Sequence, residues 1–476
     1  MKSLFLIIVL VMLMATAFSQ NISAGMARID ITPEGPIRMS GHKRKLGSDT
    51  LTPISHAKAT NRLFAKALAM GNDPSEMSVL ITVDLVGIPV HITKEVAARL
   101  NKKKNIDPSH VTISASHTHH GPEVGNLLSL TMIFADPPVT GEELAQIAMY
   151  VQELTDKLEA VALNAIESKK PALLSWGQGT VGFARNRRMI KEGLYVAQKV
   201  NPDGNTDHSL PLLKITDPAG KLIGVFLNYA CHCTTVSGNV RNMHGDWNGE
   251  AQRLIEANHP EAIAMIASGC GADQMPDTAG STEVAEMHGK EIANEVERLL
   301  SKPLQPLSGT PSVQYKQIEL PFEHIPTINE LSQQIKEKGE RAFNAYIFLE
   351  KIVRGVSIPK SIQYPVQSWV FGNELAIIFL GGEAVVDYSL RLKKELGTDR
   401  IWVNAYSNDI QCYVPTKKLL REGGYEVLGH LPFYNQPSRL SEDVEDIIIH
   451  TVHDILPEQF KAVKPVPKTI KETRRK

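Results

Sequence analysis

Three histidines stand within four positions of the sequence. His117, His119 and His120 follow the apolar run Val111–Ser116 and precede Gly121-Pro122. In an extended chain, His117 and His119 point to one side and His120 to the other. Neutral imidazole is a common zinc ligand, and a second imidazole beside it can donate a proton. The spacing predicts a metal site with His120 in a structural role. A polar loop bonding only to solvent or backbone is the alternative.

Other residues suited to metal binding or acid/base chemistry also follow short apolar runs. They are His232, Asp273, Glu383 and Tyr413. In open α/β sheets, ligands bind in the crevice beyond the carboxyl ends of the strands. We therefore expect these separated positions to converge on one site.

Each of these motifs also has a structural alternative. Cys231 and Cys233 flank His232, but no second CxxC-like pair completes a thiolate site, so buried, inert thiols are favoured. Asp246 precedes an expected helix, where it is as suited to capping backbone N–H groups as to catalysis. Glu383 follows two glycines and suits metal ligation, general-base work or an exposed helix start.

The remaining candidates are an arginine and two tyrosines. Arg187 can bind an anionic or carbonyl oxygen, although a surface salt bridge is the ordinary role of such a residue. Tyr413 and Tyr425 can provide hydroxyl groups, whereas most tyrosines are half-buried packing residues. These positions indicate a functional site only when they are considered together with the histidines.

Short apolar runs alternate with long amphipathic stretches, which predicts an α/β fold: a mixed β-sheet core flanked by helices, with the zinc site at strand carboxyl ends. The expected strands are Met77–Val83, Val111–Ser116, Leu173–Trp176, Leu222–Tyr229, Ala262–Ala267, Leu375–Leu380 and Ile401–Asn404. The expected helices are Thr93–Lys102, Glu142–Ser168, Gly249–Ala257, Thr282–Leu300, Ile328–Val353, Tyr388–Leu396 and Glu442–Leu456. Ile328–Val353 is either a lid over a lipid cleft or a plain surface helix.

Composition and the chain ends set the expected class and location. The chain has 476 residues and a formal net charge of −1, which gives no indication of nucleic-acid binding. Residues 1–19 read as a signal peptide, with a retained signal anchor as the alternative, so a secreted or periplasmic protein is expected. Residues 20–460 form the expected catalytic domain, without a transmembrane segment, and the basic tail 461–476 is expected to be disordered. Four cysteines are too few for a disulfide scaffold.

The order of the motifs along the chain is more specific than any one motif. The sequence resembles the catalytic amino-terminal domain of the neutral/alkaline, non-lysosomal ceramidase family over about positions 24 to 430. The matching segments are Ala24–Pro33 with Met39–His42, Ser116–Pro122, Asn186-Arg187, Asn228–His232, Gly269–Pro276, Gly382-Glu383, and Tyr413 with Tyr425.

The resemblance implies a zinc ion held by four side chains and a set of catalytic neighbours. The implied ligands are His117, His232, Glu383 and Tyr413. The implied catalytic residues are His119, Arg187, Tyr425 and Asp273. The expected reaction is hydrolysis of an N-acyl amide bond by zinc-activated water. The expected substrate is a small molecule or lipid with an N-acyl group, met during transient contact with a membrane surface.

Two departures from the family pattern concern the substrate. Met275 stands where the family carries a serine, and the sequence does not extend over the carboxyl-terminal β-sandwich of full-length members. A zinc-dependent esterase or phosphoesterase therefore remains an alternative, because metal and imidazoles do not fix the bond that is cleaved. A non-catalytic exported binding protein that kept the fold is another.

Overall fold

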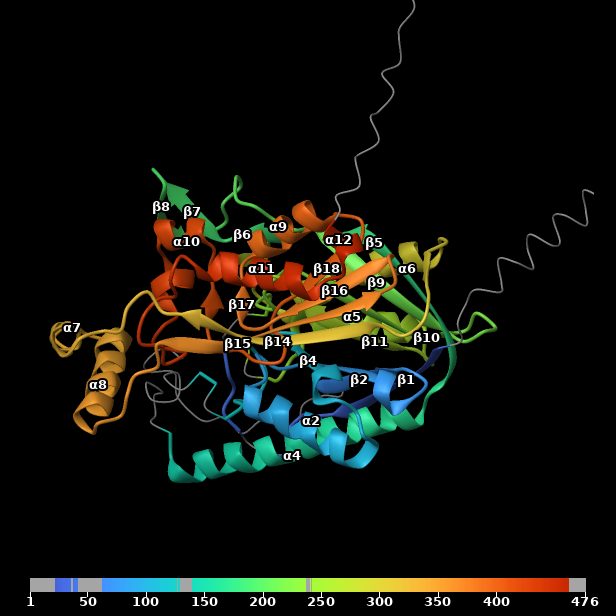
Figure 1. Cartoon of the computed structure of the whole chain (residues 1–476), viewed down its shortest axis with the longest axis horizontal. Helices are drawn as coiled ribbons and strands as arrows, with labels where there is room; N and C mark the ends of the chain where they lie inside the picture. The colour runs from blue at the N-terminus through green and yellow to red at the C-terminus, as the bar shows by residue number, and fades with distance from the viewer. Residues whose placement is uncertain are drawn as a thin grey trace, which may run out of the picture.

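The computed structural model describes residues 22–35, 37–41, 62–125, 127–128, 139–236, 240 and 242–461 (Figure 1). The predicted signal peptide, residues 1–19, lies outside the described residues. The predicted tail lies outside them as well, apart from Lys461, which ends the last helix. Within the part of the chain that the structure describes, no helix is both long and apolar enough to cross a membrane.

The larger of two main sheets has nine strands in the order β11-β10-β9-β5-β1-β2-β3-β4, with β13 also paired to β5. The strands are β1 (Ile22–Asp30), β2 (Phe64–Met70), β3 (Ser78–Val83), β4 (Val111–Ala115), β5 (Lys170–Thr180), β9 (Ser209–Thr216), β10 (Leu222–Tyr229), β11 (Ile263–Ser268) and β13 (Gln305–Leu307). The β3–β4 and β10–β11 pairs are parallel. The other neighbours are antiparallel.

This sheet curls so that β11 at one end meets β3 and β4 at the other end. A flat sheet would hold β11 and β4 about 34 Å apart, at roughly 4.8 Å per strand. Instead β11 lies against β3 and β4, and the Ser268 hydroxyl donates to the carbonyl of Ser116 at 2.8 Å. The carboxyl ends of β4, β10 and β11 therefore lie beside one another.

The second main sheet has four strands in the order β14-β15-β16-β18: β14 (Ser312–Pro321), β15 (Ser361–Phe371), β16 (Leu375–Leu380) and β18 (Ile401–Asn404). It packs on the first sheet, where Phe226 of β10 stacks on Trp402 of β18 with 4.7 Å between ring centroids. Single-residue bridges, Gly269 with Asn404 and Ser114 with Ser407, join the two sheets at one edge. The carboxyl ends of β16 and β18 thereby join those of β4 and β11.

Helices surround the paired sheets, and most of them cover the outer faces (Figure 1). They are α2 (Val90–Lys104), α4 (Gly141–Glu167), α5 (Asp246–Asn258), α6 (Thr282–Leu300), α7 (Ile328–Gln334), α8 (Glu340–Val353), α9 (Val386–Leu396), α10 (Lys417–Glu422), α11 (Val444–Ile455) and α12 (Glu458–Lys461). α2 and α4 pack on the nine-stranded sheet, α5 and α6 on its β9–β11 part, and α9 and α11 on the four-stranded sheet. The predicted mixed β-sheet core flanked by helices is confirmed.

Short elements complete the fold. They are the pairs β6 (Ala184–Asn186) with β12 (Gln274–Pro276), β7 (Arg188–Lys191) with β8 (Leu194–Gln198) and β17 (Glu383–Ala384) with β19 (Tyr413–Val414), and the turns η2 (Pro74–Glu76), η3 (Pro108–His110) and η4 (Tyr425–Gly429). Most of the residues singled out in the sequence lie on or beside these elements.

One expected element is wrong. The continuous helix expected over Ile328–Val353 is two helices, α7 and α8, that project from the body on the left of Figure 1. The break falls at Gly339, whose φ of +91° and ψ of −160° are incompatible with a helix. The two helices share a small apolar cluster of their own around Leu331 and Phe348.

Candidate metal centre

His117 begins the site directly after β4. Its backbone adopts a φ of +61°, which is unusual for a residue other than glycine. Its N–H donates to Leu85 at 3.0 Å, and its Nδ1 lies 2.6 Å from the carbonyl oxygen of Val86. These two bonds fix the ring and turn Nε2 away from the sheet.

Three imidazoles share one hydrogen-bonding arrangement. The Nδ1 atoms of His119 and His232 each lie 2.7 Å from a carbonyl oxygen, of Gly41 and Gly271 respectively. A carbonyl only accepts, so each Nδ1, like that of His117, carries a hydrogen, and in the neutral form of the ring Nε2 presents a lone pair. Backbone bonds of this kind commonly orient metal-binding histidines.

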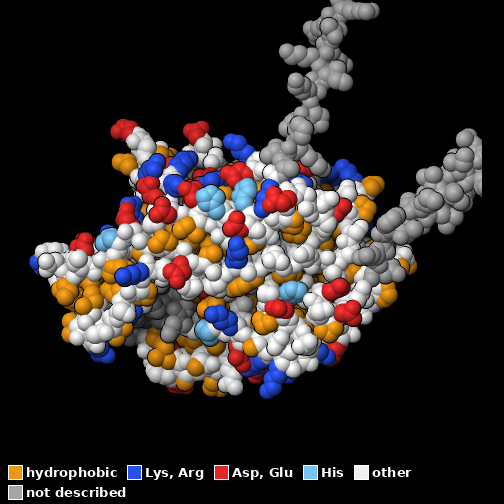
Figure 2. Space-filling view, in the orientation of Figure 1, with side chains coloured by type: hydrophobic (Ala, Val, Ile, Leu, Met, Phe, Trp, Pro, Cys, Tyr) orange, Lys and Arg blue, Asp and Glu red, His pale blue; other side chains and the backbone are white. Residues whose placement is uncertain are grey.

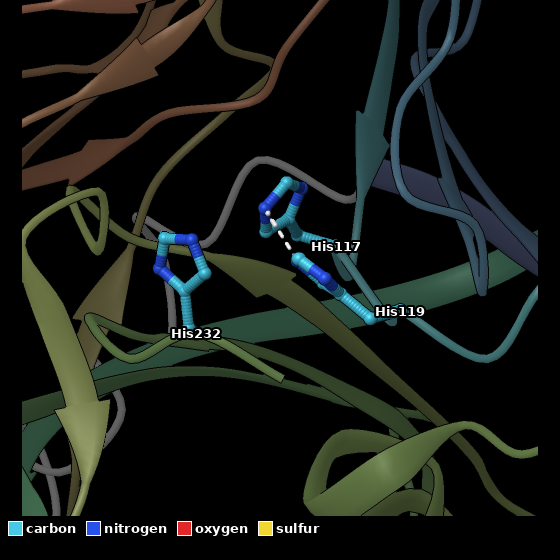
Figure 3. Close-up of side chains that lie close together, drawn as sticks. All are labelled: His117, His119 and His232. Carbon is cyan, nitrogen blue, oxygen red and sulfur yellow. Dashed lines mark hydrogen bonds between the residues drawn. The ribbon is translucent and has the colours of Figure 1, made fainter. Parts of the chain in front are cut away.

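The three Nε2 lone pairs point toward a common space. Figure 3 shows the rings of His117, His119 and His232 turned toward one another from two separate segments. Their candidate ligand atoms all lie within 4.8 Å of one another, and the Nε2 atoms of His117 and His119 are 3.1 Å apart. Two lone pairs at that separation repel unless a proton or a cation lies between them. The arrangement therefore suits a cation.

Glu383 and Tyr413 reach the same space from the two-stranded sheet β17–β19. They are register partners in the parallel β17–β19 pair, which follows a turn with Gly382 at a φ of +61°. Glu383 Oε2 lies 3.3 Å from Nε2 of His117 and 3.4 Å from that of His232. The Tyr413 hydroxyl lies 3.3 Å from Nε2 of His232.

These separations match those of a tetrahedral ion's ligands. Atoms that each lie about 2.0–2.2 Å from such an ion stand roughly 3.4 Å apart. Two imidazoles and one carboxylate are donors that zinc commonly takes, and the phenol oxygen adds a fourth donor atom. The structure thus brings together all four residues that the sequence proposed as ligands, and they fit the group.

The protonation states agree with a ligand role. Burial alone would raise the pKa of Glu383, but the imidazoles of His117 and His232 lower it well below its usual range. Burial, aided by the charge of Arg187, lowers the pKa of His232 to about 4. At neutral pH the site therefore holds a carboxylate and a neutral His232 imidazole.

Arg187 lies behind this cluster in a buried ion network. Its Nη2 donates to the Tyr413 hydroxyl at 3.1 Å, and its Nε donates to Glu426 Oε1 at 2.9 Å. Glu426 is fully buried and also pairs with Arg188. Glu426 could not be singled out from the sequence, because an acidic residue beside Tyr425 has no distinctive spacing.

Tyr425 begins η4 and closes the site on another side. Its ring centroid lies 5.5 Å from that of Tyr413, and the Arg187 guanidinium lies 5.8 Å from the Tyr425 ring. Burial raises the pKa of Tyr425, so its hydroxyl stays a donor. Tyr425 lines a cavity of about 70 Å³ together with His117, His119, Glu383 and Tyr413. Tyr434, which could not be singled out from the sequence either, lines this cavity as well.

Asp273 stands apart from this cavity. Its carboxylate accepts from the backbone N–H of Val386 at 2.9 Å and from the Asn186 side chain at 3.0 Å. Burial raises its pKa to about 6. The structure thus places Asp273 where it ties the strand before Arg187 to the start of α9, and its catalytic role stays a prediction. Met275 lies on β12, opposite Arg185 of β6.

The other motif residues have structural partners. His120 is buried, and its carbonyl accepts from the N–H of His244 at 3.0 Å. Asp246 begins α5 and accepts from the N–H groups of Thr235, Val236 and Trp247 at 3.1, 2.8 and 2.7 Å. Asp246 therefore ties the backbone of Thr235 and Val236 to the first turn of α5, which is a structural role. All four cysteines are buried and unpaired, namely Cys231, Cys233, Cys270 and Cys412.

Comparison with known proteins gives the family of this chain. The family profile described as neutral/alkaline non-lysosomal ceramidase, N-terminal, matches residues 25–299. The chain therefore belongs to the neutral/alkaline non-lysosomal ceramidase family. Among curated relatives it is 26% identical over 267 residues to the neutral ceramidase of Drosophila melanogaster, and 25% identical over 252 residues to that of Drosophila pseudoobscura pseudoobscura. These matches cover 54% and 51% of this chain but only 35% and 33% of the relatives.

Solved structures share the fold over most of the chain. The crystal structure of neutral ceramidase from Pseudomonas aeruginosa superimposes with a TM-score of 0.65 at 17% identity, covering 94% of this chain and 76% of that one. A structure described as ceramidase complexed with C2 gives a TM-score of 0.66 at 16% identity, covering 94% and 77%. At this identity the likeness establishes the fold.

Proposed function

We propose that this protein is a zinc-dependent hydrolase that cleaves an N-acyl amide bond, with a ceramide-like lipid as the substrate class. The observation that carries the proposal is the convergence of His117, His232, Glu383 and Tyr413 at separations of 3.3 to 3.4 Å in a chain of the ceramidase family. We assign these four as the zinc ligands.

The surrounding residues supply the remaining chemistry. A zinc ion held there would act as a Lewis acid that polarises a carbonyl and makes water more acidic. His119 offers Nε2 at the cavity to accept and return a proton. Tyr425 is positioned to donate to the oxyanion that develops, and removing one such donor typically costs about 3 kcal/mol of barrier. Arg187 orients the Tyr413 hydroxyl by its hydrogen bond.

We assign the attack on the amide to water and not to a side chain. Met275 occupies the position of the family's serine and has no hydroxyl group. The cavity of about 70 Å³ has room for a water molecule among polar side chains. Zinc-activated water can also attack an ester or a phosphoester, so the experiment below includes both kinds of bond.

A larger groove beside the cavity fits an apolar chain. It has a volume of about 740 Å³ and shares Tyr434 with the metal cavity. Its apolar lining comes mainly from the start of α4 and from Val90, Leu127 and Ile410. An acyl or sphingoid chain lying there would place its amide near the ligands.

The projecting α7–α8 hairpin suits contact with the lipid surface that holds such a substrate. Tyr346 and Val353 are 52% and 77% exposed, and Figure 2 shows apolar side chains gathered on this projection. Lys336, Lys338 and Arg341 are exposed on the same hairpin, interspersed with Glu337 and Glu340, and can contact anionic headgroups. We propose that an exported form of the protein uses it for transient docking.

The test is to purify the protein, measure its zinc content and follow hydrolysis of N-acyl lipids, N-acyl sugars, esters and phosphoesters by mass spectrometry. We expect stoichiometric zinc and release of fatty acid from N-acyl lipids, abolished by a chelator and restored by zinc. Chelator-insensitive cleavage would exclude the proposed mechanism. Turnover of only esters or phosphoesters would replace the amide assignment. Zinc binding without any turnover would favour the binding protein.

A further inference from the structure

The two oxygens of the Glu383 carboxylate have different partners. Oε2 faces the candidate ligand atoms, at 3.3 Å from His117 and 3.4 Å from His232. Oε1 accepts a hydrogen bond of 2.5 Å from the hydroxyl of Tyr434. No part of the proposed reaction so far uses Tyr434.

A carboxylate needs such a second anchor to present one oxygen in a fixed direction. The terminal torsion of glutamate is broad, because it joins sp³ and sp² carbons. The backbone of Glu383 is held by the N–H···O bond to Cys412 at 2.9 Å, but this bond does not fix the end of the side chain. The Tyr406 hydroxyl lies 3.5 Å from Oε2, at the limit of a hydrogen bond, and does not reach Oε1 as a substitute.

We propose that Tyr434 is a positioning residue that holds Glu383 in the orientation in which Oε2 serves as a single-oxygen metal ligand. This inference rests on the proposed metal centre. With Oε1 engaged, the carboxylate cannot rotate to offer both oxygens, which would leave room for water or substrate as a fifth ligand beside the four side chains. Outer hydrogen bonds of this kind commonly set metal affinity as strongly as some ligands do.

The surroundings of Tyr434 explain why a tyrosine suits this position. Its ring lies 6.3 Å from that of Tyr413 and 6.1 Å from that of His430, between centroids. The same residue lines both the 70 Å³ metal cavity and the 740 Å³ groove. Tyr434 therefore forms part of the wall between the two spaces, and its hydroxyl donates to Glu383.

The chain offers a matched control in Tyr364. This tyrosine is buried. It lies near the turn before Glu383, since a Cβ added at Gly381 would lie 3.4 Å from its ring. Its hydroxyl has no hydrogen-bond partner among the described residues. Tyr364→Phe therefore removes the same atom as Tyr434→Phe without touching Glu383.

The experiment compares the full-length wild type, Tyr434→Phe and Tyr364→Phe for zinc affinity, by competition with a chromophoric chelator, and for the visible spectrum of the Co²⁺-loaded protein. We expect Tyr434→Phe to bind zinc about 10- to 100-fold more weakly. We also expect an altered Co²⁺ spectrum and a lower kcat with little change in KM. Tyr364→Phe is expected to match the wild type.

A double-mutant cycle with Glu383→Gln tests whether Tyr434 acts through the carboxylate. Tyr434→Phe should weaken zinc binding in the wild type but have no further effect in Glu383→Gln. Wild-type zinc affinity and Co²⁺ spectrum in Tyr434→Phe, an equal loss in Tyr364→Phe, or full additivity in the cycle would each overturn the inference. A wild type that binds zinc without cleaving amides would refute the proposed function alone, whereas one that binds no zinc would refute both.

Discussion

Two buried carboxyl groups near the histidine cluster show opposite electrostatic outcomes. Glu383 and Glu123 are 2% and 1% exposed. The pKa of Glu383 falls well below its usual range, because the imidazoles of His117 and His232 outweigh burial. The pKa of Glu123 rises to about 7, because burial dominates and backbone N–H groups such as that of Leu128 only partly offset it. Burial sets the cost of a charge, and the neighbouring groups decide whether the charge persists.

The comparison separates a carboxylate prepared for a cation from a carboxyl group that is held in the fold. A region that keeps a buried carboxylate among imidazoles is arranged to hold a cation. A region that shifts its carboxyl group toward the neutral form needs no cation to balance a charge. The experiments below test this difference, from the largest expected effect to the smallest.

Glu383→Gln should have the largest effect. It removes the negative charge but keeps the shape, so zinc content should fall and N-acyl hydrolysis should drop more than about a thousandfold, equivalent to about 4 kcal/mol of barrier. Zinc analysis and single-substrate kinetics measure both quantities. Full zinc occupancy together with full activity would remove Glu383 from the ligand set. Glu123→Gln serves as the control that leaves zinc content unchanged.

Glu426→Gln should mainly reduce stability. It leaves the buried guanidinium groups of Arg187 and Arg188 without their shared carboxylate, and breaking a buried ion pair on one side costs about 3–5 kcal/mol. Denaturant unfolding measures the change. Glu422→Gln is the control, because Glu422 is partly exposed, pairs with Lys418 as well, and contacts Arg188 at 3.2 Å without contacting Arg187. Equal losses of unfolding free energy in the two variants would show that the ion pairs of Glu426 stabilise the fold no more than those of Glu422.

Glu123→Gln should increase stability in a pH-dependent way. A carboxyl group whose folded pKa is raised from 4.5 to about 7 favours folding below 4.5 and loses that contribution as pH rises to 7. The variant should therefore equal the wild type below pH 4.5 and exceed it above pH 7 by at most about 3 kcal/mol.

Unfolding curves between pH 4 and pH 8 test this prediction. Glu167→Gln, at a side chain that is 63% exposed, is the control and should show no such trend. A constant difference across this range, or a wild type that gains on the variant as pH rises, would contradict the assignment of Glu123.

Changes on the α7–α8 hairpin should have the smallest effect on the fold. Replacing Tyr346 and Val353 together by serine should weaken binding to anionic phospholipid vesicles about tenfold, because both apolar groups are exposed in the free protein. Stability should change by less than about 0.5 kcal/mol. Vesicle sedimentation measures binding. Met287→Ser, an exposed position on α6, is the control, and an equal loss there would refute docking by the hairpin.

Local patterns in the sequence predicted many elements but missed others for a clear reason. The apolar runs at β3, β4, β10, β11, β16 and β18 were expected within a few residues of their observed bounds. β2, with the sequence Phe-Ala-Lys-Ala-Leu-Ala-Met, consists largely of good helix formers and becomes a strand only because it is buried between β1 and β3. β14 presents mostly exposed side chains, so its apolar signal is weak.

The sequence by itself determined the chemical types and the order of the site residues. Imidazole, carboxylate and phenol groups follow apolar runs in the sequence, and this pattern does not depend on how the strands later pack. Only the tertiary structure decided which of them meet. The folding of β11 against β4 and the parallel pairing of Glu383 with Tyr413 bring together groups from distant segments. Glu426 and Tyr434 lie outside any local pattern, because their roles depend on contacts across the sheets.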